Sequence, residues 1–83
     1  MTPGEHLSLA LAALAERRRT TPCAADPGPW LSDDPRHRAE AATRCIPCPV
    51  LLECAAAADD ALVRFGVWGG RDRTAQPRRK ASA

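Results

Sequence analysis

Large apolar side chains are scarce in this sequence. Its 83 residues include one Phe, two Trp and no Tyr, and only 13 are Leu, Ile, Val or Phe. Seventeen residues are alanine, a side chain too small to bury much apolar area. A chain of this length buries only about 60% of the surface that its unfolded form exposes, and scaffolds this small usually need a crosslink. We therefore expect one domain held together by its four cysteines.

Other absences narrow the function. No apolar run approaches the roughly 20 residues that span a bilayer. No Ser-His-Asp set, phosphate-binding glycine loop or catalytic carboxylate pair is visible, so we expect neither an enzyme nor a small-molecule substrate. The apolar stretch 7–15 follows Glu5 and precedes Arg17–Arg19, which reverses the charge order of an export signal. We therefore expect a cytoplasmic protein without membrane contact.

Helix signals, without any strand-like alternation, predict a small all-α fold of three to four short helices. Thr2, Pro3 and Glu5 have the form of a capping box, which predicts an N-terminal helix within residues 1–21. The apolar side chains of that helix recur at helical spacing, at Leu7, Leu11 and Leu14.

Residues 22–70 are predicted to form the functional domain, and residues 71–83 a basic, flexible tail. Residues 22–35 contain four prolines and a glycine and should form a loop. A second helix is expected at 35–44 and a third from Pro49, followed by a short fourth piece at 60–65.

The four cysteines, Cys23, Cys45, Cys48 and Cys54, follow the pattern C-x21-C-x2-C-x5-C. Cys48 is predicted at the N-cap of the third helix, where free backbone N–H groups favour a thiolate. An iron–sulfur cluster accepts four thiolates at irregular spacing. Structural zinc usually takes two regular pairs, and neither His6 nor His37 supplies one. Zinc and thiol–disulfide redox chemistry therefore stay as alternatives to a cluster.

Two motifs in order carry a resemblance to a known family. "CIPCPVLLEC", within the full cysteine pattern, and "GVWGG" further along resemble the WhiB-like family of actinobacteria and their phages. The segment "DPGPW", with Trp30 as its aromatic residue, is similar to a segment of that family. The resemblance implies one [4Fe–4S] cluster held by the four cysteines. It also implies a cytoplasmic transcription factor that binds region 4 of the primary sigma factor in RNA polymerase, with a redox or nitric-oxide response left open.

The "GVWGG" stretch is predicted to present Trp68 to a partner. Glycines at 66, 69 and 70 permit positive φ and leave the ring unshielded, and an indole on such a turn is a strong interface anchor. The residues expected at the partner surface are Trp68, Gly66, Val67, Gly69, Gly70, Phe65 and Trp30. For Trp68 the alternative is a core position, and for Trp30 it is a lid over the cluster.

The tail is predicted to contact promoter DNA. Residues 71–83 contain five basic side chains and Asp72, a net charge of +4. Such a run can neutralise phosphates or enter a narrow minor groove. The residues expected to bind DNA are Arg78, Arg79, Lys80, Arg71 and Arg73. The alternative is a terminus that only improves solubility.

Overall fold

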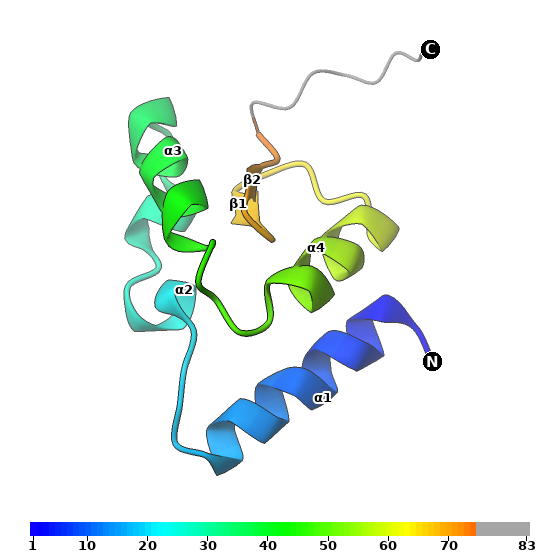
Figure 1. Cartoon of the computed structure of the whole chain (residues 1–83). Helices are drawn as coiled ribbons and strands as arrows, with labels where there is room; N and C mark the ends of the chain where they lie inside the picture. The colour runs from blue at the N-terminus through cyan, green and yellow to red at the C-terminus, as the bar shows by residue number, and fades with distance from the viewer. Residues whose placement is uncertain (75–83) are drawn as a thin grey trace.

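The computed structural model describes residues 1–74, so the predicted DNA contacts Arg78, Arg79 and Lys80 lie outside the described residues. The structure is mostly helical (Figure 1), as expected for a small all-α protein. Its elements are α1 (Pro3–Glu16), α2 (Pro22–Ala25), the 3-10 helix η1 (Gly28–Leu31), α3 (Pro35–Arg44), α4 (Leu51–Asp60), β1 (Val67–Trp68) and β2 (Arg71–Asp72). Among the described helices, none is long and apolar enough to cross a membrane.

Helix α1 begins as predicted. The Thr2 hydroxyl accepts from the backbone N–H of Glu5 at 3.1 Å, and the Glu5 carboxylate accepts from the Thr2 N–H at 2.8 Å, which completes the capping box. Figure 1 shows α1 lying alongside α4, against which it packs. Its packing face runs through Leu7, Ala10 and the buried Leu14, whereas Leu11 is exposed. The predicted apolar face was therefore wrong at one position, because Ala10 and not Leu11 lies on it.

The segment predicted as one loop contains two short helices. Thr21 caps α2 by accepting from the N–H of Ala24 at 3.3 Å, and Pro22 occupies the first turn. In η1 the backbone N–H of Trp30 donates to the Pro27 carbonyl at 3.0 Å. Proline suits the first turn of a helix because its missing N–H has no partner there anyway. These prolines start helical turns rather than excluding them.

The helices on either side of the cysteine pair begin differently. Asp34 caps α3 as predicted, and its carboxylate accepts from the Arg36 N–H at 2.9 Å. Helix α4 begins at Leu51 instead of Pro49, after Val50, which makes no side-chain cap bond. Cys48 therefore precedes the helix and is not its N-cap. The expected fourth piece at 60–65 is not helical, because the chain leaves α4 through turns.

A two-residue hairpin near the end of the described chain corrects the expectation that no strand is present. Val67 pairs with Asp72 and Trp68 with Arg71 in antiparallel register. The linking residues Gly69 and Gly70 have φ of +61° and +82°, the backbone of a type I′ turn. Strands of two residues are too short to show alternation in a sequence.

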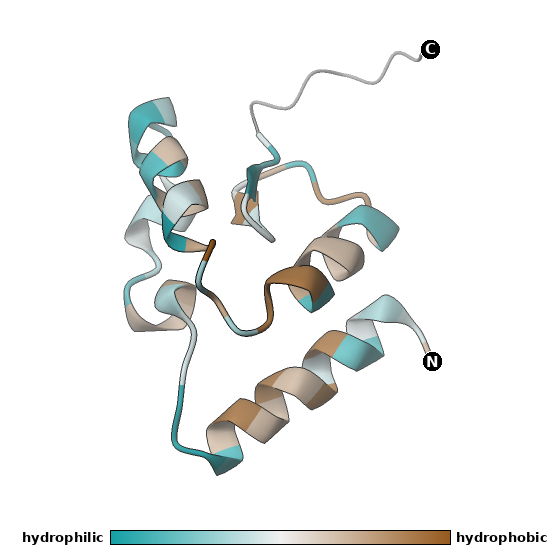
Figure 2. Ribbon diagram, viewed as in Figure 1, coloured by the Kyte–Doolittle hydropathy of each residue, from teal (hydrophilic) through white to brown (hydrophobic). Residues whose placement is uncertain are grey.

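The core is as thin as the composition predicts. Trp30, Ala41, Cys45 and Val67 form it, with Ala42 and Leu51 packed at its edge. It therefore joins η1, α3 and the hairpin. Figure 2 shows hydrophobic residues along α1 and at the start of α4, whereas much of α3 is hydrophilic. One cysteine belongs to this core, so the fold and the cysteine site share side chains.

Candidate metal centre and tryptophan hairpin

Each cysteine comes from a different part of the fold. Cys23 lies in α2 and is exposed, whereas Cys45 is the C-cap of α3 and is buried. Cys48 lies in the connection to α4, Cys54 lies within α4, and both are half-buried. The connection is a pair of tight turns, in which Cys48 N–H donates to the Cys45 carbonyl at 2.9 Å and Leu51 N–H to the Cys48 carbonyl at 3.2 Å.

Cys48 and Cys54 each lie within electrostatic reach of other cysteines. Burial raises the pKa of Cys48 and Cys54, and a negative charge on Cys23 or Cys45 raises both pKa values further. The backbone N–H groups of Val50 and Gly69 act in the opposite direction on Cys48 and Cys54. Cys48 thus differs from the sequence expectation of a favoured thiolate, because it lies before the helix, partly buried among other thiols.

Four thiols are a donor set that either a zinc ion or an iron–sulfur cluster can take. Because the pKa values of Cys48 and Cys54 are raised, these two thiols ionise more readily when a bound cation compensates their charge. In residues 1–74, no three His, Cys, Asp or Glu side chains are gathered as a single-ion site. A tetrahedral zinc ion with Zn–S bonds of about 2.3 Å would need the sulfurs about 3.8 Å apart. Four thiolates are equally the ligand set of an iron–sulfur cluster.

The geometry of Cys45 and Cys48 also differs from that of a reactive dithiol pair. Reactive pairs have an accessible thiol with a lowered pKa. Here Cys45 is buried and the pKa of Cys48 is raised. The reductase alternative has no support in this geometry.

Trp30 lies directly against one of these cysteines. Its side chain is 4% exposed, and its indole N–H donates to the Cys45 sulfur at 3.2 Å. The Arg44 guanidinium lies 4.9 Å from the centre of the indole, within the range of a cation–π interaction. The contact with Cys45 is compatible with the lid alternative, which stays a prediction. A place for Trp30 on the partner surface does not agree with its burial.

The hairpin turn is packed on the cysteine-bearing elements. A side chain at Gly69 would meet the Ala55 backbone at 2.4 Å, and one at Gly70 would lie 3.2 Å from Leu51 and 3.8 Å from Cys45. Together with the positive φ values, these contacts require glycine at both positions. The turn that follows Trp68 therefore packs against Cys45 and against Ala55, the residue after Cys54.

The side chains around Trp68 divide between core and surface. Trp68 is half-buried, Phe65 is 47% exposed, and Val67 is buried at 5%. Val67 therefore packs in the core and does not widen a surface patch, contrary to the prediction. Gly66 is buried, and its φ of +82° turns the chain into the hairpin.

Leu31 is a surface residue that sequence reasoning missed. It is 59% exposed, and its Cδ2 lies 3.5 Å from the position of a side chain at Gly66, where Trp68 Nε1 lies at 3.7 Å. Leu31 and Trp68 therefore flank the same glycine. The sequence feature that could have indicated Leu31 is its position as a large aliphatic residue directly after Trp30 in a proline-rich segment.

Arg73 is not a free basic side chain. It is 5% exposed, and its guanidinium donates to the Trp68 carbonyl at 3.1 and 3.3 Å and to the Asp59 carboxylate. This hydrogen bond lowers the pKa of Asp59. The prediction that Arg73 binds DNA is wrong for this structure, because its donors hold the hairpin to the end of α4.

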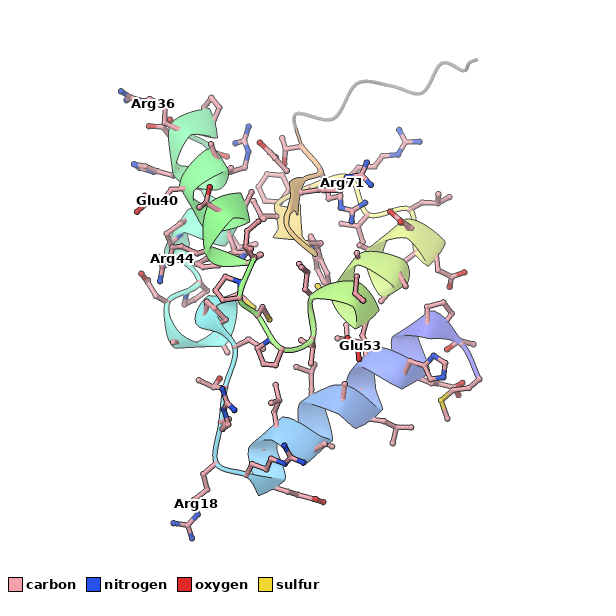
Figure 3. All side chains as sticks on the ribbon, in the orientation of Figure 1. Arg18, Arg36, Glu40, Arg44, Glu53 and Arg71 are labelled. Atoms are coloured by element: carbon pink, nitrogen blue, oxygen red, sulfur yellow. The ribbon has the colours of Figure 1, made fainter. Side chains whose placement is uncertain are left out.

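Arg38 makes a second buried connection to the hairpin. It is 6% exposed, and it donates to both carboxylate oxygens of Asp72 at 3.0 Å and to the Ser32 carbonyl at 2.8 Å. Arg71, by contrast, is exposed. In Figure 3, Arg36 and Arg44 project from α3, whereas Arg18 and Arg71 project from other parts of the molecule.

These features define a class: a small helical domain framed by four cysteines, with a tryptophan hairpin packed on the cysteine-bearing elements. A family model described as "Transcription factor WhiB" matches residues 15–80. Because the match covers most of the sequence, the chain belongs to the WhiB family. Most of α1 precedes the matched range.

Three relatives illustrate the similarity. "Probable transcriptional regulator WhiB7" of Mycobacterium tuberculosis is 39% identical over 56 residues, 66% of this chain and 61% of the relative. "Transcriptional regulator WhiB4" of the same species is 61% identical over 31 residues, 37% of this chain and 26% of the relative. "Transcriptional regulator WhiB7" of Mycolicibacterium smegmatis is 34% identical over 55 residues, 65% of this chain and 53% of the relative. The chain thus spans 61% or less of each relative. No solved structure matches.

Proposed function

We propose that this chain is a cytoplasmic transcription regulator that holds one [4Fe–4S] cluster and docks on region 4 of the primary sigma factor. One observation carries the proposal: Cys48 and Cys54 lie within electrostatic reach of the other cysteines, and the Trp68 turn is packed against Cys45 and against Ala55, which follows Cys54. The names of the three relatives as transcriptional regulators support it further.

Cys23, Cys45, Cys48 and Cys54 are the proposed ligands. The bound cluster would supply positive charge at its irons and a four-point crosslink between α2, α3, α4 and their connection. Four thiolates leave a [4Fe–4S]²⁺ centre with a net charge of about −2. The indole N–H of Trp30 and the nearby Arg44 cation are groups of this chain that would offset that charge.

The proposed sigma-binding surface is an apolar patch of Trp68, Phe65 and Leu31, referred to below as the Trp68 patch. Its three side chains are exposed or half-buried; those of Leu31 and Trp68 lie beside Gly66, and Phe65 precedes this glycine in the chain. Within residues 1–74, Trp68 makes hydrogen bonds through its carbonyl oxygen and not through its indole. A large aromatic side chain with an unused donor is the kind of residue that anchors an interface.

Contact with promoter DNA is a second part of the proposal. Arg71 is exposed and available, and Arg78, Arg79 and Lys80 follow in the sequence. A few phosphate contacts bind weakly and in a salt-dependent manner. Attachment to a sigma factor on a promoter raises their effective concentration and makes them useful.

The test uses the full chain, purified without oxygen, and sigma region 4 immobilised on a biosensor. Trp68→Ala should weaken binding by about thirtyfold, the loss of a hot-spot residue. The matched control is Leu9→Ala, which truncates an exposed apolar residue on α1, away from the patch, and should change affinity less than about twofold. Equal affinities for the two variants would refute the docking proposal.

A further inference from the structure

Within residues 1–74, the indole N–H of Trp30 has one hydrogen-bond acceptor, the sulfur of Cys45. The ring is buried with Ala41, Cys45 and Val67, and the N–H points at the Cys45 sulfur at 3.2 Å. In the cluster-loaded protein this sulfur would be a thiolate, which accepts a hydrogen bond more strongly than a thiol.

The backbone of Trp30 is held at its N–H and its carbonyl, and its ring is buried in the core, so the fold restricts the indole donor. Its backbone N–H is bonded to the Pro27 carbonyl within η1. On the other side Gly66 approaches so closely that a side chain there would meet the Trp30 carbonyl at 2.9 Å. A donor held by the fold costs no reorganisation when the charge on its acceptor changes.

Arg44 strengthens this arrangement. Its guanidinium lies 4.9 Å from the centre of the indole, and its ion pair with Asp26, at 3.8 Å, leaves it over the ring. A cation at the face of an indole draws electron density from the ring. The N–H on the ring edge then becomes a better donor, by the polarisation that links neighbouring polar contacts.

We infer that Trp30 is a positioning residue that tunes the cluster through Cys45. Reduction adds one negative charge to a centre that already carries about −2, and hydrogen bonds to its sulfurs stabilise the added charge. The Trp30 N–H therefore raises the reduction potential of the cluster. The inference rests on the proposed cluster, but it assigns a function that neither sigma binding nor DNA binding requires.

The experiment compares reduction potentials in the full chain loaded with its cluster. Each sample is titrated anaerobically with dithionite in the presence of mediator dyes, and the visible absorbance of the cluster is followed. Trp30→Phe keeps a ring and removes the donor, so its midpoint potential should be more negative than that of the wild type. Val67→Ala loosens the same core without removing a donor, and its potential should stay close to the wild-type value.

A second variant separates the hydrogen bond from packing. Site-specific replacement of Trp30 by benzothienylalanine keeps the bicyclic shape and exchanges the N–H for sulfur. The same negative shift in this variant supports the inference, as does failure to hold the cluster while Val67→Ala holds it. A wild-type potential in the benzothienylalanine variant overturns it and leaves Trp30 a packing residue, even where Trp30→Phe does not fold. A wild-type chain without acid-labile sulfide refutes the proposed function itself, which distinguishes the two failures.

Discussion

The two tryptophans of this chain have opposite environments. Trp30 is buried at the end of a proline-started turn and donates its indole N–H to a cysteine. Trp68 is half-buried beside two glycines, and within residues 1–74 it is hydrogen-bonded through its backbone and not through its indole. The difference shows that the contacts around each indole, and not the residue type, distinguish the two side chains. One indole contacts a cysteine, and the other is the side chain that we propose as the anchor for a partner.

The largest effect on both tryptophans is expected from loss of the proposed metal site. Cys54→Ser removes a proposed ligand from the middle of α4, and the thin core cannot hold both tryptophans in place without the crosslink. We expect loss of bound iron and loss of a cooperative urea transition, measured on protein purified without oxygen. His37→Ala is the control, because its side chain is exposed and bonded to Ser32 and Asp34, and it should keep the iron. Full iron content in Cys54→Ser would contradict the ligand assignment.

The next largest effect is expected where the Trp68 turn meets α4. Gly69→Ala forces a methyl group against the Ala55 backbone at a φ of +61°. We expect the free energy of unfolding to fall by roughly 2–4 kcal/mol, measured by urea denaturation of the loaded protein.

Gly4→Ala is the matched control for this change. Its site lies in α1, where the nearest atom to an added methyl is 3.9 Å away. This variant should be more stable than the wild type by about 0.5–1 kcal/mol. Equal effects at the two glycines would show that the turn is not packed on α4 as described.

Arg71 and Arg73 lie two residues apart, one exposed and one buried, and their variants should differ in stability. Arg73→Gln leaves the Trp68 carbonyl and the Asp59 carboxylate without their donors, and we expect a loss of about 1–3 kcal/mol of stability. Arg71→Gln changes an exposed side chain and should cost less than about 0.5 kcal/mol.

For DNA affinity, we expect the opposite order, with the larger loss in Arg71→Gln. In a fluorescence anisotropy assay with a promoter duplex, Arg71→Gln should weaken binding and reduce its salt dependence. Arg73→Gln should leave both unchanged once the protein is folded. A larger loss of DNA affinity for Arg73→Gln would reinstate the original prediction for that residue.

The smallest effect concerns the edge of the Trp68 patch. Leu31→Ala should weaken binding to sigma region 4 by about five- to tenfold, since it truncates a peripheral apolar contact. Leu62→Ala, a similarly exposed leucine after α4, should leave the affinity unchanged. Equal losses for both would indicate that Leu31 does not belong to the patch.

The sequence predicts most of what local chemistry determines. The caps at Thr2 and Asp34 form as expected because a side chain and a nearby N–H decide them. The mostly helical class is also confirmed. The short α2 and the hairpin were missed because four helical residues in a proline-rich segment, and strands of two residues, give no periodic signal.

Contacts between distant segments account for the remaining errors. Arg73 looks like a tail residue, and its burial depends on Asp59, from another element. The position of Trp30 depends on Cys45, fifteen residues away. No pattern within either segment indicates these partners. The cysteine pattern, although irregular, indicated the candidate ligands, but only the fold shows which side chains lie against them.

The central claim is that a [4Fe–4S] cluster holds this small chain in the shape that presents Trp68. The most direct measurement determines iron, zinc and acid-labile sulfide in the anaerobically purified chain, together with its affinity for sigma region 4 before and after iron is removed by chelation. The account predicts about four iron and four sulfide per chain, and loss of binding once they are removed. A chain that contains no sulfide, stays folded and binds with undiminished affinity would contradict it.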